Sequence, residues 1–203
     1  MGDIMPRGIA NLFSILPSIE LLQIIEVLLN TKEIKLELPK SNKVQVWSSD
    51  GEMLQVEKEE LYKKSTDLSN YLIQFWWPQM DDISIKLAYE GQLCVCDIYL
   101  DGLSESQFED ILDLLISVTM QSFETVGFVV DRRELSSEFE WTRFFTRKEQ
   151  LESHYLEQYG LKVYKEYEIK DGNRDQLKDY GSDYVYVVLP NREKGKIILY
   201  LLG

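Results

Sequence analysis

Cysteine and histidine, two side chains that enzymes often use as nucleophiles, bases or metal ligands, are scarce in this chain. Its 203 residues include two cysteines, Cys94 and Cys96, and one histidine, His154. A zinc site takes about four thiolate, imidazole or carboxylate ligands, so these three residues do not form a metal-binding pattern. Phosphate-loop, dinucleotide-binding and nucleophile-elbow motifs are absent as well. We therefore expect no cofactor, no metal site and no catalytic activity.

The cysteines and the histidine have simpler interpretations. On a strand, Cys94 and Cys96 share one face, where a disulfide between them would be strained, so we expect small buried side chains. His154 lies on the polar side of a predicted helix, and the residues four positions before and after it are glutamines, so no carboxylate at these positions orients it. We expect a solvated histidine there and not a member of a nucleophilic triad.

Basic residues are scarce too, and their absence is local. The chain has 35 acidic and 22 basic residues, a net charge of −13. Residues 1–130 account for −12 of this, and residues 131–203 for −1. No lysine or arginine occurs between Lys86 and Arg132, a stretch that we call the base-free window. Binding to nucleic acid needs clustered basic side chains, so the composition argues against a nucleic-acid partner and favours a basic protein partner.

Long hydrophobic runs are missing. The most apolar stretch, 19–29, is interrupted by Glu20, Gln23 and Glu26, and it is shorter than the roughly 20 apolar residues that cross a bilayer. The first residues lack the basic and apolar regions of a signal peptide. We expect a cytoplasmic protein with no membrane partner.

Hydrophobic periodicity and turn residues predict the secondary structure. Helices are expected at 18–30, 58–71, 105–121 and 137–145, and a further helix from a capping box at 146–149 to Gly160. Strands are expected at 33–38, 43–47, 53–57, 83–89, 93–100, 125–130, 161–170, 183–189 and 196–202. The segment 83–130 therefore predicts a β-β-α-β unit.

Hairpins mixed with helices, without a regular alternation of strand and helix, indicate an α+β fold. We expect a largely antiparallel sheet built from several hairpins, with helices packed on it. The prediction is one domain, 1–203, within which 1–78 and 79–203 could form two lobes.

The helix expected at 105–121 provides the main candidate site. Its apolar residues gather on one side, and the opposite side has an acidic band made of Glu105, Glu109, Asp110 and Asp113. This could be an ordinary solvated face. Solvated faces usually alternate lysine with acids, however, and an acidic band without counter-charges would steer a basic partner. We predict a partner-binding surface made of Asp101, Glu105, Glu109, Asp110, Asp113 and Trp141.

Aromatic residues are a second source of contact area. Most are expected in the core. The adjacent Trp76 and Trp77 cannot easily face the same interior, so one of them, or Trp141, is a candidate for an exposed interface anchor.

Two alternatives remain open. Glu-x-Lys triplets at 33–35 and 168–170 stand on predicted strands, an arrangement that metal-dependent nucleases use, so Glu168 and Lys170 would belong to a metal-dependent hydrolase. A homo-oligomeric scaffold is the other possibility.

The middle of the chain carries a resemblance to a known family. The hairpin at 83–100, the sequence Asp97–Glu109, the acidic helix and the strand at 126–130 are similar to the immunity proteins of bacterial polymorphic toxin systems. The aromatic stretch 141–145 and the strand 184–189, followed by Pro190 and Asn191, also fit. The resemblance implies a cytosolic α+β inhibitor that binds a cognate toxin, blocks its active site and has no catalytic activity of its own.

Overall fold

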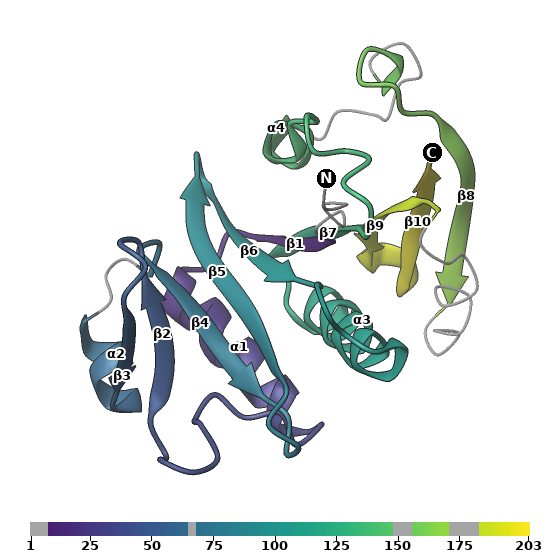
Figure 1. Cartoon of the computed structure of the whole chain (residues 1–203). Coiled ribbons are helices and arrows are strands. Elements are labelled where there is room, and N and C mark those ends of the chain that lie inside the picture. The colour runs from purple at the N-terminus through teal and green to yellow at the C-terminus, as the bar shows by residue number, and fades with distance from the viewer. Residues whose placement is uncertain (1–7, 65–67, 148–155, 171–182) are drawn as a thin grey trace.

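The computed structural model describes residues 8–64, 68–147, 156–170 and 183–203 (Figure 1). Its α-helices are α1 (Ser18–Asn30), α2 (Lys58–Lys64), α3 (Glu105–Gln121) and α4 (Trp141–Arg147). Its strands are β1 (Ile9–Ser14), β2 (Val44–Ser48), β3 (Met53–Val56), β4 (Tyr71–Trp76), β5 (Asp82–Glu90), β6 (Leu93–Tyr99), β7 (Thr125–Asp131), β8 (Val163–Lys170), β9 (Val185–Asn191) and β10 (Lys196–Leu202). A short 3-10 helix, η1 (Arg192–Lys194), joins β9 to β10. This mixture of helices and antiparallel strands confirms the α+β class.

One sheet holds the ten described strands, in the order β3-β2-β4-β5-β6-β1-β7-β9-β10-β8. Every neighbouring pair is antiparallel. β1 lies inside the sheet, where Leu12 is opposite Cys96 of β6 on one side and Phe128 of β7 on the other. β6 and β7 therefore run parallel to each other, and α3 provides the long crossover that parallel strands need.

The predicted β-β-α-β unit is not confirmed. β5 and β6 form the expected hairpin, and α3 and β7 follow along the chain. β7, however, pairs with β1 and β9 and not with the hairpin. β1 occupies the position beside β6 because its alternating residues complete the core on both faces of the sheet.

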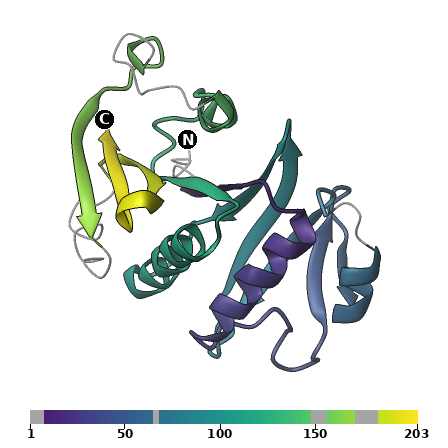
Figure 2. The same ribbon diagram turned by 180° about the vertical axis from the view of Figure 1, so that it is seen from behind.

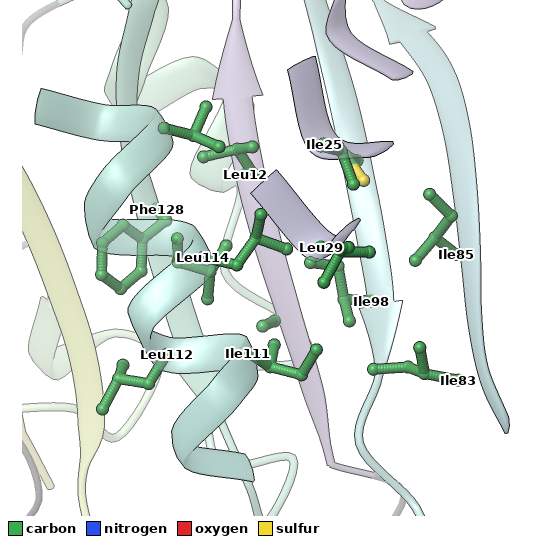
Figure 3. Close-up of a cluster of buried hydrophobic side chains, with 14 of the residues drawn as sticks. Leu12, Ile25, Leu29, Ile83, Ile85, Ile98, Ile111, Leu112, Leu114 and Phe128 are labelled. Carbon is green, nitrogen blue, oxygen red and sulfur yellow. The ribbon is translucent and has the colours of Figure 1, made fainter. Parts of the chain in front are cut away.

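Two helices cover one face of the sheet, which we call the helix face. α1 and α3 contact each other and lie side by side on this face (Figure 2). The buried core between them and the strands includes Ile25 and Leu29 of α1, Ile111 and Leu114 of α3, and Leu12, Ile85, Ile98 and Phe128 of the sheet (Figure 3). Burial of each such side chain stabilises the fold by about 1.5–3 kcal/mol relative to exposure, and this is the main reason that the helices dock.

The opposite face of the sheet is covered differently. Phe13, Val95 and Val129, which alternate with the helix-face residues, pack with Trp141, Phe144 and Phe145 of α4 in a second core cluster. Towards the β3 edge, a cross-strand row on this face remains partly exposed. It runs through Trp47, Leu72, Lys86, Asp97 and Asn11 of β2, β4, β5, β6 and β1.

Several predicted elements agree with the structure, and others do not. The helices at 18–30 and 105–121 and the strand at 196–202 match in both bounds. The expected strand at 33–38 is wrong: this segment forms only isolated bridges. The helix expected at 58–71 is described only to Lys64, and β4 begins at Tyr71. Most of the helix expected at 146–160, including His154, lies outside the described residues.

None of the helices in the described ranges has the length and hydropathy of a membrane span.

Candidate functional site

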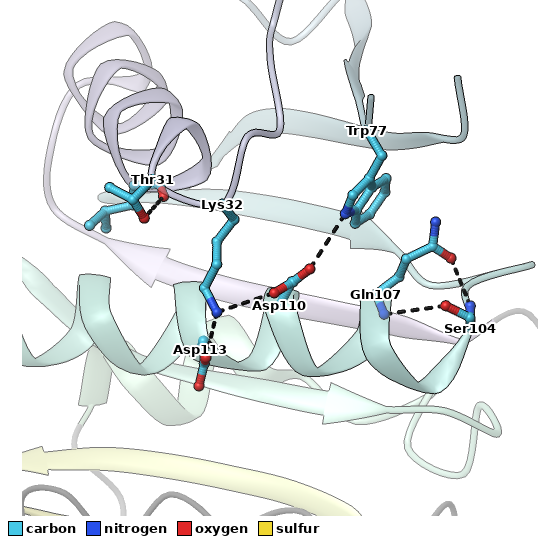
Figure 4. Close-up of polar contacts among 8 residues, drawn as sticks. Thr31, Lys32, Trp77, Ser104, Gln107, Asp110 and Asp113 are labelled. Atoms are coloured by element: carbon cyan, nitrogen blue, oxygen red, sulfur yellow. Dashed lines mark hydrogen bonds and ion pairs between the residues drawn. The ribbon is translucent and has the colours of Figure 1, made fainter. Parts of the chain in front are cut away.

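α3 begins where the sequence predicts, because its first turn is capped by side chains. The hydroxyl of Ser104 accepts a hydrogen bond from the Gln107 backbone N–H at 3.3 Å, and the Gln107 side chain accepts one from the Ser104 N–H at 2.9 Å (Figure 4). This capping box satisfies two backbone donors of the helix end and fixes which residues face outward.

The acidic band on α3 is not without counter-charges, and that premise of the sequence interpretation is wrong. The Lys32 ammonium group lies 3.1 Å from Asp110 and 2.8 Å from Asp113 (Figure 4). Arg132 lies 2.9 Å from Glu105. Both bases come from outside the base-free window: Lys32 follows α1 and Arg132 follows β7. Two bases distant in sequence therefore pair with three of the four carboxylates of the band.

Two other residues of the predicted surface have structural roles. Asp101 accepts a hydrogen bond from the Gly8 backbone N–H at 3.0 Å and so ties the end of β6 to the start of β1. Trp141 is 7% exposed, like Trp76 at 8% and Trp77 at 4%, so the prediction of an exposed anchor among these three is wrong. The exposed tryptophan is Trp47, at 37%.

An open cavity of about 930 Å³ lies on the sheet face opposite α1 and α3, and we call it the acidic cavity. Strands β1 and β6 form its floor, including Asn11 and Asp97. Its walls are the turn between β5 and β6 (Glu90–Gln92), residues of the loop at 134–140, and α4. Figure 1 shows α4 opposite the β5–β6 turn. The volume is within the range of about 300–1,000 Å³ that is typical of ligand pockets.

Acidic side chains outnumber basic ones in the lining of this cavity. Among the described residues, the charged ones that line it are Glu90, Asp97, Asp131, Glu134, Glu140 and Arg143. Arg143 is 3.4 Å from Glu140, one helical turn away. The Thr142 hydroxyl donates a hydrogen bond to Glu90, which ties α4 to the β5–β6 turn. The described part of the lining has five carboxylates and one guanidinium, an excess of negative charge whose potential the low-dielectric walls concentrate.

Asp97 is the half-buried carboxylate on the cavity floor. Its Oδ1 atom accepts a hydrogen bond from the Asn11 side-chain amide at 2.7 Å, across the β1–β6 pair. Burial raises the pKa of Asp97, and the nearby Glu90 carboxylate adds to this, while Asn11 and Lys86 act in the opposite direction. Among the residues that the structure describes, neither Asp97 nor Glu134 forms an ion pair.

Hydrogen bonds that Asp131 accepts hold one wall of the cavity in place. This buried carboxylate accepts bonds from the backbone N–H groups of Arg133, Leu135 and Ser136, and from the Ser136 hydroxyl at 2.7 Å. The Ser136 oxygen in turn accepts the indole N–H of Trp141 at 3.2 Å. The end of β7, the loop and the start of α4 are therefore connected by buried hydrogen bonds, which makes the wall preformed.

Aromatic packing fixes α4 against the sheet. Phe13 of β1 stacks on Phe145 at a centroid distance of 4.3 Å, and Phe144 and Trp141 continue the cluster. A Cβ atom on Gly127 of β7 would lie 2.6 Å from the Phe145 ring, so glycine permits the close approach of α4.

The cysteines are unreactive in this setting. Both are buried on the helix face of β6. Burial raises the pKa of the Cys94 thiol to about 12 and that of Cys96 well above its ordinary value. Both thiols are therefore protonated at neutral pH, where only the thiolate is a strong nucleophile or metal ligand.

The two triplets of the hydrolase alternative do not form one site. Glu33 and Lys35 line a cavity of about 550 Å³ beside Trp76 of β4, whereas the second triplet lies on β8 at the other edge of the sheet. Glu168 is exposed on the edge strand β8, 2.7 Å from Lys196 and 3.3 Å from Lys194, and these lysines lower its pKa. Lys170 ends β8, and its side chain is outside the described set. Glu33 lies in a turn with φ 61° and not on a strand. The described residues contain no group of three or more His, Cys, Asp or Glu side chains placed to share a metal ion.

Comparisons with protein-family models, with curated proteins and with solved structures found no match for this chain.

Sequence interpretation missed the acidic cavity, although part of the signal was present. Glu90, Asp97 and Asp131 belong to or adjoin the base-free window. The sequence does not show that they meet Glu134 and Glu140, because that depends on β1 lying between β6 and β7 and on α4 folding back over the sheet.

Proposed function

We propose that this protein is an acidic, protein-binding inhibitor of the immunity type, which neutralises a basic partner such as a cognate toxin. The acidic cavity is the centre of the docking surface. The observation that carries this proposal is the concentration of carboxylates in a preformed cavity, whereas Glu105, Asp110 and Asp113 of α3 are paired with Arg132 or Lys32.

The surroundings of the cavity suit a protein partner. Trp47 and Leu72 lie on the row of side chains that leads across β2 and β4 towards Asp97 on the floor. A partly exposed apolar strip beside a charged pocket is the usual composition of an interface, in which aromatic residues bury area and charges set orientation and association rate.

Two variants with equal charge change distinguish the cavity from α3. The cavity variant combines Asp97→Asn with Glu134→Gln, and the α3 variant combines Glu105→Gln with Asp113→Asn. Each removes two negative charges with little change in side-chain shape.

The experiment is affinity capture from extract of the cells that make the protein, with the wild type and both variants as bait. We expect the wild type and the α3 variant to retain the same basic protein in stoichiometric amount, and the cavity variant to lose it. The captured protein should be active alone and inhibited by the wild type. Capture that is equal for all three baits, or a captured protein whose activity is unaffected, would overturn the proposal.

A further inference from the structure

We propose that the acidic cavity binds an arginine side chain of the partner protein, with the guanidinium group on Asp97. This inference rests on the proposed function and specifies which chemical group of the partner enters the site.

The position of Asp97 makes it the anchor. It lies on β6, on the floor of the cavity, with Glu90 on one wall and Glu134 and Glu140 on the loop opposite. Asn11 occupies the Oδ1 atom of Asp97, and among the described residues no donor is bonded to Oδ2. A bound cation with N–H groups can therefore donate a hydrogen bond to Oδ2 of Asp97, and further carboxylates lie around it.

The lining favours arginine over lysine. Guanidinium is planar, presents five N–H donors that match a carboxylate in pairs, and stacks on aromatic rings, whereas ammonium is a compact and strongly hydrated charge. Tyr99, Phe139 and Trp141 supply aromatic surface in the cavity, and Val95 supplies an apolar surface for the aliphatic part of the side chain. The loss of hydration on entry is therefore offset by contacts that lysine makes less well.

The cavity is also large enough for a side chain that a protein backbone presents. Its volume of about 930 Å³ is near the upper end of the range that is typical of ligand pockets.

The test is a titration of the full-length protein with N-acetyl-L-arginine methylamide, followed by the NMR signals of the four tryptophan indole N–H groups. We expect saturable shifts at Trp141, which lines the cavity, and none at Trp77, which lies beside Asp110 of α3. N-acetyl-L-citrulline methylamide, which has the same shape without the charge, should bind at least tenfold more weakly. The lysine analogue should also bind more weakly.

Two variants test whether Asp97 is the residue that binds the guanidinium group. Asp97→Asn, which keeps the acceptor for Asn11, should weaken binding of the arginine probe at least tenfold, while Asp113→Asn should leave it unchanged. Equal binding of arginine and citrulline probes, equal binding of the arginine probe to Asp97→Asn, or tighter binding of the lysine analogue would each overturn the inference.

Failure here is distinguishable from failure of the proposed function. If the arginine probe does not bind but capture of the basic partner still depends on Asp97 and Glu134, only the arginine assignment is wrong. If the probe binds as expected but no partner is captured, the cavity is a cation site and the inhibitor function is wrong.

Discussion

Asp97 carries a charge that opposes folding, because burial raises its pKa above the ordinary value of 3.8. The folded state therefore holds a proton on this group at pH values where the unfolded chain has released it. By linkage, the contribution of Asp97 to the free energy of unfolding falls as the pH rises from 3.8 through the raised pKa. A residue that weakens the fold in this way is typical of binding sites.

The first prediction follows from this decrease in stability with rising pH. Asp97→Asn should be no less stable than the wild type at pH 7. The melting temperature of the variant minus that of the wild type should increase as the pH rises from 3.5 to 7. Thermal unfolding of both proteins across this range measures the difference. A clear loss of stability at pH 7 would mean that the charge serves the fold.

Asp131 has the opposite role, since its carboxylate is 3% exposed and organises the loop before α4. Asp131→Ala leaves several buried donors without an acceptor, so we expect a loss of about 2–4 kcal/mol in the free energy of unfolding. The exposed Glu134 is the control in the same loop, and Glu134→Ala should change stability by less than about 0.5 kcal/mol. Urea unfolding measures both, and equal effects would contradict the role assigned to Asp131.

Among the elements, α4 depends on a close contact with β7. A methyl group on Gly127 would meet the Val188 carbonyl oxygen at 2.5 Å and the Phe145 ring at 2.6 Å, at a φ of 153°. Gly127→Ala should therefore lower the free energy of unfolding by about 2–4 kcal/mol and loosen α4.

Gly51 is the matched control for that substitution. It also has a positive φ, of 80°, but open space around it, so Gly51→Ala should cost only about 1 kcal/mol of backbone strain. Denaturant titration gives the two values, and hydrogen exchange reports whether the α4 amides open. A Gly127→Ala protein as stable as Gly51→Ala would show that α4 is not tightly packed.

Some helices and strands could be predicted from the sequence, and others could not. α1 and α3 were predictable because periodicity and, for α3, a capping box act within the element. β1 and β4 were not anticipated, since short runs acquire their structure from partners distant in sequence, such as Cys96 beside Leu12. The prediction that the acidic band lacks counter-charges was wrong for the same reason, because Lys32 and Arg132 reach α3 only through the tertiary fold.

The whole molecule depends on one strand near its N-terminus. β1 joins β6 to β7, so the two groups of strands on either side are hydrogen-bonded to each other only through it in the described sheet. Deletion of residues 1–14 should abolish cooperative unfolding of the chain, as followed by circular dichroism against denaturant. Removal of residues 1–7 alone is the control, because it leaves β1 intact and should preserve the transition.

Nine of the 35 acidic residues lie in two groups with different roles. In one group, on α3, three of the four carboxylates pair with bases of the same molecule. The other group lines a cavity in which, among the described residues, one arginine accompanies five carboxylates. The first contributes at most about 1 kcal/mol per exposed ion pair to stability, while the second retains a negative potential that a basic partner can use.

The most direct test of this account is the affinity of the captured partner for the two charge variants as a function of salt. We predict that Asp97→Asn with Glu134→Gln weakens binding at least tenfold at low salt and flattens its salt dependence, whereas Glu105→Gln with Asp113→Asn behaves like the wild type. Weakened binding for the α3 variant, with wild-type affinity for the cavity variant, would contradict the account and return the docking surface to α3.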